Sequence, residues 1–328
     1  MHRLEIYFNQ KIDPEHTLIF FDEIQACERA LTSLKYFQEE ASEYHVIAAG
    51  SLLGVAMNRE RYSFPVGKVE QLNMYPMTFQ EFLLALQEEM LLEEIRICYV
   101  ERRKLDYILH EKALQLYREY LIVGGMPEAV EVYVKGESLM EVTLIQQEIL
   151  NAYVADMAKY ASPTETAKIL ACFDSIPTQL AKDNKKFQYK VVAQGGKASL
   201  FGASFKLYMS DVGLLTTKAG VTAYDIISGN DHIFIGALTE NYIANVFEQN
   251  EHKLYYWTSG GNAEIDFILE IGGKVIPVEV KAREHVKSRS LSVYNKQYNA
   301  ADTIRISGKN FGFENGIISL PLYAAWLV

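Results

Sequence analysis

The sequence predicts a mixed α/β protein with more than one domain, and three stretches carry this prediction. Residues 18–21 and 46–49 are short apolar runs on either side of a helical pattern at 26–40, which is typical of a βαβ unit with a sheet covered on both faces. Residues 79–150 place apolar side chains at helical spacing. Residues 264–283 alternate polar and apolar side chains around a Gly-Gly turn, which is typical of a β-hairpin.

Length and charge limit the class of protein. At 328 residues the chain exceeds what one hydrophobic core usually organises, and its 49% hydrophobic content is sufficient to build more than one. The 42 acidic residues outnumber the 32 basic ones, giving a formal net charge of −10. This balance excludes a surface that coats DNA uniformly, although local basic segments remain compatible with it.

The cysteines and the apolar runs predict the compartment. Cys27, Cys98 and Cys172 match no metal-binding spacing and no disulfide framework. The first residues are charged and lack the apolar centre of a signal peptide, and no apolar run approaches the roughly 20 residues that span a bilayer. We therefore predict a cytoplasmic protein with no membrane partner.

The helical region is predicted to have two interruptions. The Gly-Gly-Met-Pro sequence at 124–127 breaks the pattern within what we interpret as a helical lid. Further along, two short helices are predicted, with Ser175 or Thr178 as the N-cap of the second.

The first predicted strand ends in two acidic residues, Asp22 and Glu23. In P-loop ATPases such a pair holds Mg²⁺ and polarises the water that attacks the γ-phosphate. We interpret Asp22 as a ligand of Mg²⁺ and nucleotide, Glu23 as catalytic, and Ser51, at the tip of the next strand, as a partner of the γ-phosphate region. The alternative is that Asp22 caps the following helix and that the helix dipole favours Glu23.

The loop that normally holds the phosphates is not found among these residues. Each of the four Gly-Lys pairs lacks a following Ser or Thr, so no G-x-x-x-x-G-K-[ST] sequence occurs. The backbone amides and the lysine of that loop supply most of the phosphate contacts. The sequence therefore predicts half of a nucleotide site, with doubtful ATP binding and impaired hydrolysis.

The predicted hairpin brings charged residues together. If the glycines at 272–273 are the two central turn residues, Asp266 lies opposite Glu279, and Glu264 lies opposite Lys281. The apolar residues that alternate with them are expected to share the other, core-facing side of the hairpin: Ile265, Phe267, Leu269, Ile276, Val278 and Val280.

Two carboxylates directly opposite each other repel unless a cation lies between them. We therefore predict a Mg²⁺ or Mn²⁺ site held by Asp266 and Glu279, with Glu240 from a helix at 237–248 as a third ligand. Lys281 would orient or activate the attacking water. The alternative is a solvated strand face on which Glu264 and Lys281 form an ordinary ion pair.

Two short segments are basic within this acidic chain and predict non-specific contacts with nucleic acid phosphates. One is 281–290, for which the alternative is the charged start of a helix, and the other follows residue 181. Their basic residues are Lys281, Arg283, Lys287 and Arg289 in the first, and Lys182, Lys185, Lys186, Lys190 and Lys197 in the second.

Several segments resemble a prokaryotic family of AAA-type ATP-binding proteins. In the N-terminal half these are Leu18–Gln25, Ala48–Gly54, Ser63–Glu70 and Gly124–Val130. The C-terminal domain of that family has an uncharacterised role and a core similar to restriction-endonuclease-like folds. The segments that resemble it are Phe205–Leu215, Glu240–Ala244, Ala263–Phe267 and Pro277–Lys281.

The resemblance implies an α/β protein built of four parts. They are a partial P-loop (AAA-type) core with a parallel sheet at 1–78, a helical lid at 79–160, a shortened winged-helix-like module at 161–204 and a restriction-endonuclease-like, nuclease-like α/β domain at 205–328. The family's phosphate-binding loop is missing here. The implied cofactors are ATP and Mg²⁺ or Mn²⁺, and the expected partners are nucleic acid and further copies of the chain.

Three functions follow from these patterns. The first is an AAA-type ATP-binding protein, impaired in hydrolysis, with a role linked to nucleic acid or regulation. The second is a metal-dependent nuclease, or a nucleic-acid binder derived from one, acting through the C-terminal domain. The third is a non-catalytic interaction protein.

Overall fold

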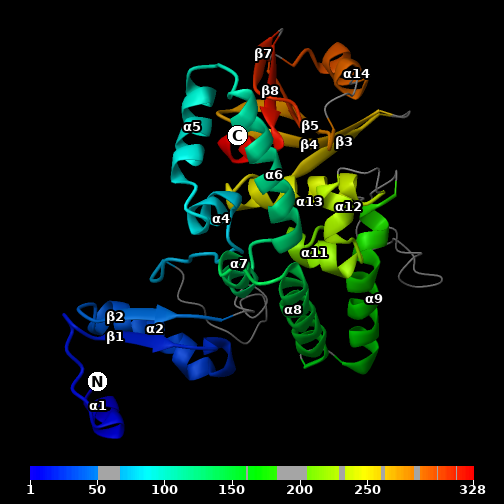
Figure 1. Cartoon of the computed structure of the whole chain (residues 1–328). Helices are drawn as coiled ribbons and strands as arrows, with labels where there is room; N and C mark the ends of the chain where they lie inside the picture. Colours follow the sequence, from blue (N-terminus) through cyan, green and yellow to red (C-terminus); the bar gives the residue numbers. More distant parts are fainter. Residues whose placement is uncertain are drawn as a thin grey trace. The chain divides into compact units, whose positions relative to one another are not determined.

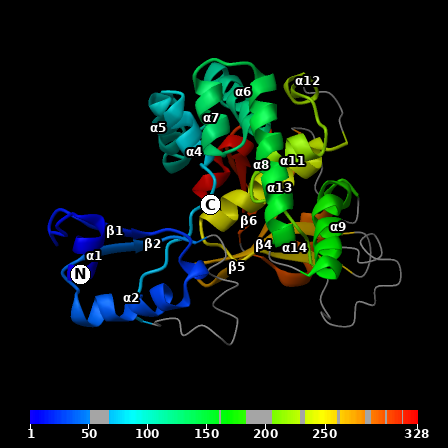
Figure 2. The same cartoon turned by 90° about the horizontal axis from the view of Figure 1, so that it is seen from below.

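The protein is described from a computed structural model (Figures 1 and 2). It divides into two compact units, Met1–Met74 and Tyr75–Val328, which we describe separately. The predicted domain boundaries within the second unit stay predictions. The structure describes residues 1–50, 67–159, 162–182, 205–228, 233–259, 263–283, 289–300, 302–314 and 316–328.

The first unit contains the predicted βαβ arrangement. Strands β1 and β2 are parallel, and the register pairs Phe21 with Ala48 at their carboxyl ends. A helix connects the two strands, as the apolar stripe of residues 26–40 predicted. The elements of this unit are α1 (His2–Phe8), β1 (Leu18–Phe21), the 3-10 helix η1 (Ile24–Ala26), α2 (Glu28–Glu40) and β2 (His45–Ala48).

Only one face of this small sheet is covered within the described part of the unit. On that face the ring of Phe21 contacts the ring of Phe37 in α2, with centroids 5.9 Å apart. On the other face Leu18, Phe20 and Ile47 are 55%, 56% and 50% exposed. Cover on the second face stays a prediction, because among the described residues α2 packs on one side and alternate side chains point away from it.

The second unit begins with a series of helices, as predicted. The capping box of Thr78 and Glu81 starts the first of them, since each side chain accepts a hydrogen bond from the backbone N–H of the other. The helices are α4 (Phe79–Ala85), α5 (Glu89–Val100), α6 (Tyr107–Val123), α7 (Pro127–Val134), α8 (Leu139–Lys159), α9 (Pro163–Leu180), α11 (Val212–Lys218), α12 (Ala223–Ile227) and α13 (Ile235–Gln249). In the parts of the chain that the structure covers, none of the helices combines the length and apolar character needed to cross a bilayer.

The predicted break near Ser175 is wrong. Helix α9 continues through this position with Pro177 inside it, and the Ser175 hydroxyl donates to the carbonyl of Cys172 at 2.7 Å. The helix buries Phe173 and Leu180 on one face, and this packing outweighs the hydrogen bond that the proline cannot make. Most of the predicted winged-helix-like module, from 183 to 204, lies outside the described residues.

The end of α6 is a packed junction of several helices. The Gly125 N–H donates to Asp211 Oδ2 at 2.6 Å, and the Gly125 carbonyl accepts from the Met77 N–H at 2.7 Å. Asp211 also caps α11 by accepting from the Leu214 N–H at 2.9 Å. The Gly-Gly-Met-Pro sequence therefore ends α6 where the chain before α4 and the start of α11 meet it.

A six-stranded mixed sheet completes the unit. The strand order is β3-β4-β5-β6-β8-β7, in which β5, β6 and β8 are parallel and the other pairs are antiparallel. In Figures 1 and 2 helix α13 (yellow) lies between this sheet and α11, and it contacts both. The elements are β3 (Tyr255–Thr258), β4 (Glu264–Ile271), β5 (Lys274–Val280), α14 (Arg289–Tyr298), β6 (Thr303–Ser307), β7 (Gly312–Glu314), β8 (Ile317–Pro321) and the 3-10 helix η2 (Leu322–Leu327).

The predicted hairpin and its register are confirmed over five pairs, from Ile271 with Lys274 to Phe267 with Val278. Gly272 and the glycine after it have φ values of 57° and 76°, the left-handed conformations that a two-residue hairpin turn requires.

One residue of the hairpin departs from the predicted face. Ile265 packs with Leu291 and Tyr294 of α14, whereas Phe267 belongs to the main core. The pairing of β3 with β4 shifts register between Tyr255 and Trp257, and a shift of this kind interrupts the alternation of side chains along β4.

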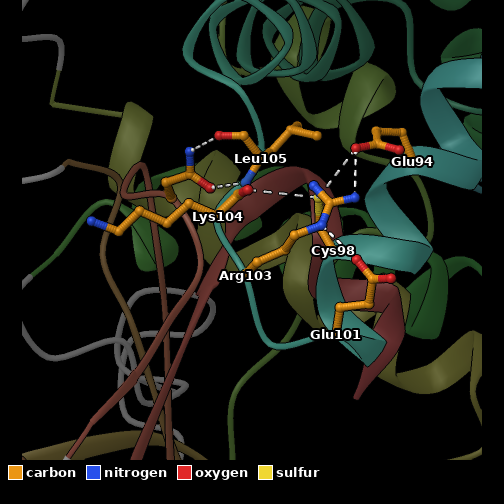
Figure 3. Close-up of polar contacts among 7 residues, drawn as sticks. Glu94, Cys98, Glu101, Arg103, Lys104 and Leu105 are labelled. Atoms are coloured by element: carbon orange, nitrogen blue, oxygen red, sulfur yellow. Dashed lines mark hydrogen bonds and ion pairs between the residues drawn. The ribbon is translucent and has the colours of Figure 1, made fainter.

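The loop between α5 and α6 is hydrogen-bonded to Asn310, which lies in the connection between β6 and β7. Within the loop, the guanidinium of Arg103 donates to Glu94, Glu101 and the sulfur of Cys98 at 2.8, 2.6 and 2.9 Å (Figure 3). Burial raises the pKa of Cys98 even beside this arginine, so the sulfur is a thiol at neutral pH. Asn310 then makes two bonds to buried Leu105: its Nδ2 donates to the carbonyl at 2.8 Å, and its Oδ1 accepts from the N–H at 3.0 Å.

We expect Asn310→Ala to lower the free energy of unfolding of the second unit by about 2 kcal/mol, because both backbone groups of Leu105 would be buried without a partner. Urea denaturation followed by circular dichroism measures this. Asn310→Asp, which keeps the acceptor and loses the donor, should have an intermediate effect. An alanine variant as stable as the wild type would contradict the prediction.

Helix η2 lies inside this unit. Tyr323 and Ala324 are fully buried there, and η2 contacts α5, α6, α13 and the strands β6 and β8. The Tyr323 hydroxyl lies 2.9 Å from Nδ1 of His110, which is itself buried in α6. A segment late in the sequence thus completes the core between helices and sheet.

Candidate functional sites

The first candidate site is the carboxyl edge of β1 and β2. Two backbone hydrogen bonds join the segments that follow the two strands. The Ala49 N–H donates to the carbonyl of Phe21 at 2.8 Å, and the carbonyl of Ala49 accepts from the Ile24 N–H at 3.1 Å. Asp22 and Glu23 lie between these two bonds and are exposed. Ser51 lies outside the described residues.

The local geometry excludes the helix-cap alternative for Asp22. Helix α2 begins at Glu28 with Cys27 as its N-cap, so Asp22 is too early to cap it. Asp22 Oδ1 instead accepts from the Glu23 N–H at 3.0 Å. Glu23 has φ 48° and ψ 44°, a left-handed conformation that costs a residue with a side chain about 1–2 kcal/mol. A strained turn that exposes two carboxylates at the edge of a parallel sheet is compatible with binding a hydrated cation.

The second candidate site is the end of the β4–β5 hairpin. The paired ladder stops at Phe267 and Val278, where β5 also pairs with β6. Beyond these residues a side chain joins the two strands, because Oδ2 of Asp266 accepts a hydrogen bond from the Val280 N–H at 2.8 Å. Asp266 therefore lies against β5, one residue from Glu279.

Glu279 is buried between two basic side chains. It is 1% exposed, and its Oε1 lies 3.3 Å from the Lys281 ammonium. The register of β5 and β6 pairs it with Arg305, whose Nε lies 3.9 Å from Oε2. At that separation Oε2 has no hydrogen-bond partner.

Glu240, in α13, is held by a different cation. Its Oε1 accepts from Lys206 at 3.0 Å and from the hydroxyl of Tyr208 at 2.8 Å. The same lysine lies 2.7 Å from Oε1 of Glu264. The predicted pair of Glu264 with Lys281 is therefore wrong: Glu264 pairs with Lys206, and Lys281 pairs with Glu279.

The charges around Lys206 keep its ammonium ionised. Burial alone would lower the pKa of Lys206, but Glu240, Glu264 and Asp266 outweigh burial and raise it. Burial, and then the charge of Glu240, raises the pKa of Tyr208, so this hydroxyl keeps its proton and acts as a donor. The cluster therefore contains fixed carboxylates, a charged lysine and a neutral phenol.

The predicted metal ligands do not form a ready metal centre in this arrangement. Within the described ranges, no three Asp, Glu, His or Cys side chains are grouped so that they could hold a metal ion. The reason is that Glu240 and Glu279 each face their own cation, and Asp266 faces a backbone amide. Their role as metal ligands, like that of Asp22, stays a prediction.

Sequence reasoning missed Lys206, Tyr208 and Arg305. Each lies in a short segment where polar and apolar residues alternate, Phe205–Met209 and Thr303–Ser307. A single charged residue between apolar neighbours in such a segment indicates a buried ion pair. Which acid it pairs with depends on contacts between segments distant in sequence, as with Lys206 and Glu240.

Comparisons with protein families match three stretches of the chain. Residues 2–83 match the AAA domain. Residues 114–203 match a domain of unknown function, DUF8612, and residues 235–324 match another, DUF4143.

These matches support an AAA-type protein with an uncharacterised C-terminal domain. The AAA match supports an ATPase-like relationship and is consistent with the use of ATP and Mg²⁺. No curated protein and no solved structure gave a match. The DUF4143 stretch includes Glu240, Asp266, Glu279 and Lys281, whereas Lys206 lies outside all three stretches.

Proposed function

We propose that the first unit is the nucleotide-facing part of an AAA-type protein and that Asp22 and Glu23 face Mg²⁺-bound ATP. The observation that carries the proposal is the strained, exposed turn of these two acids at the carboxyl edge of the parallel strands, within the stretch that matches the AAA domain. Carboxylates at this edge serve Mg²⁺ and the hydrolytic water in P-loop ATPases.

The proposal also implies that these residues bind ATP weakly. The 328 residues contain no G-x-x-x-x-G-K-[ST] loop, so the amides and the lysine that hold the phosphates are not supplied by these residues. We expect Mg²⁺·ATP to bind the 328-residue protein in the millimolar range, about 4 kcal/mol of binding free energy, without turnover above background.

Titration calorimetry with ATP, with and without Mg²⁺, tests this. Asp22→Asn should remove the part of the binding that depends on Mg²⁺, because a neutral amide is a poorer partner for a hydrated cation. Glu40→Gln is the matched control, since Glu40 is an exposed acid at the end of α2. Equal effects of the two substitutions would overturn the proposed role of Asp22. Micromolar binding or steady hydrolysis would overturn the proposed impairment.

A second candidate function is supported by the end of the β4–β5 hairpin. We propose that the C-terminal domain acts on phosphodiesters of nucleic acid in the presence of Mg²⁺ or Mn²⁺, with Asp266, Glu279 and Lys281 at the site. The confirmed hairpin register and the bond from Val280 to Asp266 support it, because they bring both acids and the lysine to one end of the hairpin. Cleavage of labelled single- and double-stranded DNA and RNA with each metal tests the proposal.

If the folded protein neither binds nucleotide nor cleaves nucleic acid, the third expected function remains, that of a non-catalytic protein that binds a partner.

A further inference from the structure

We infer that the Lys206 ammonium occupies a divalent-cation position among the carboxylates of the C-terminal domain, so that Lys206 and a metal ion exclude each other there. The inference rests on the second proposed function and deepens it, because it explains why carboxylates suited to a metal are not grouped as a metal centre.

The first support is the geometry around the ammonium. Lys206 Nζ lies 3.0 Å from Glu240 Oε1 and 2.7 Å from Glu264 Oε1, and the side chains of Lys206 and Glu240 are 3% and 2% exposed. Small divalent cations in proteins are commonly held by one or two carboxylates together with neutral oxygens and water. The Tyr208 hydroxyl, 2.8 Å from the same Glu240 oxygen, is a neutral oxygen beside this carboxylate.

The second support is the charge that remains when Lys206 is removed. Glu240 and Glu264 both lie within 3.0 Å of the Lys206 ammonium. The basic side chains at this end of the hairpin, Lys281 and Arg305, already face Glu279. Removing Lys206 takes away the cation that faces the buried Glu240 carboxylate, and a loss of this kind is among the most costly changes in a protein interior.

The third support is an acceptor that is buried and without a hydrogen-bond partner. Oε2 of Glu279 belongs to a side chain that is 2% exposed, and the cation facing it is Arg305 Nε at 3.9 Å. It lies on the residue next to Val280, whose amide holds Asp266. The same end of the hairpin thus combines a lysine held by two acids and an acid with spare capacity to bind a cation.

The experiment compares thermal unfolding of the full chain with and without Mn²⁺ for the wild type, Lys206→Ala and Lys206→Met. Each substitution is expected to lower the Tm of the second unit by roughly 10 °C. Mn²⁺ at about 100 times its Kd is expected to restore around half of this loss in the variants. The wild type should show a much smaller response, because its lysine already fills the position.

Three control variants separate a specific cation site from a general effect of charge. Lys206→Arg keeps the positive charge and should respond as the wild type does. Lys206→Ala combined with Glu240→Gln removes the acid that a metal would bind and should lose the response. Lys274→Ala removes the lysine of an exposed pair with Asp302, on the same hairpin, and should change neither Tm nor response.

An equal Mn²⁺ response in the wild type and both Lys206 variants would overturn the inference, whatever their Tm. Failure of both variants to fold in Mn²⁺ would also overturn it, since a bound cation should replace the missing charge. The cleavage assay of the wild type is a separate readout. If the wild type cleaves but Mn²⁺ does not raise the Tm of the variants, only the inference about Lys206 is excluded. If Mn²⁺ raises the Tm of the variants but the wild type does not cleave, only the proposed nuclease activity is excluded.

Discussion

Gly125→Ala is expected to destabilise the second unit strongly, by about 3 kcal/mol or more. A Cβ at this position would lie 2.0 Å from the carbonyl oxygen of Met77 and 2.8 Å from its nitrogen. Both are backbone atoms of a segment that is hydrogen-bonded to Gly125 itself, so neither can move without breaking that bond. The bond from Gly125 to buried Asp211 would be strained at the same time.

Urea denaturation followed by circular dichroism measures this effect. Gly236→Ala is the matched control, because Gly236 lies in the first turn of α13 and, apart from its own helix backbone and chain neighbours, no described residue comes within 4 Å of the position that its added Cβ would take. There alanine should leave the stability unchanged or raise it by up to about 1 kcal/mol. A Gly125→Ala protein as stable as the control would show that α4 and α6 do not meet in the way described.

Lys281→Ala is expected to reduce cleavage of nucleic acid by about 100-fold or more, the usual effect of removing one charged group that stabilises a transition state. Lys281 is the partly exposed cation of this site, at 31%, and so can reach a phosphodiester while it faces buried Glu279. Asp266→Asn should give a comparable loss with the fold retained, because an amide oxygen can still accept from the Val280 N–H.

Rates of cleavage with Mn²⁺, measured beside circular dichroism spectra of each protein, test this prediction. Lys274→Ala serves as the control. Lys274 lies at the start of β5 and pairs with Asp302, and this variant should cleave at the wild-type rate. No cleavage by folded wild type, or equal rates for the two lysine variants, would exclude the proposed role of Lys281.

The parts of the fold that depend on local chemistry could be predicted from the sequence. Two consecutive glycines determine a hairpin turn and so its register, and the Gly-Gly-Met-Pro sequence at 124–127 ends one helix and starts the next. Prediction failed where packing outweighs a local signal. Pro177 is tolerated inside α9 because of the burial around it, and the shift between β3 and β4 depends on a neighbouring strand.

For the candidate sites, the positions of the acidic residues could be predicted from the sequence. The pattern of acids indicated Asp22 and Glu23 at a sheet edge and Asp266 near Glu279, because strand periodicity fixes which residues lie together. The partners of those acids were not predictable. Lys206 reaches Glu240 from a segment outside helices and strands, and nothing in its local sequence specifies that contact.

The position of η2 has a consequence for how this protein is made. Residues 322–327 emerge from the ribosome more than 200 positions after His110, yet Tyr323 fills the space beside that histidine. Helices α5 and α6 therefore leave the ribosome before the much later segment that packs against them in the folded unit. During synthesis the surface that η2 contacts is open to chaperones, and the second unit completes its core only when translation has passed η2.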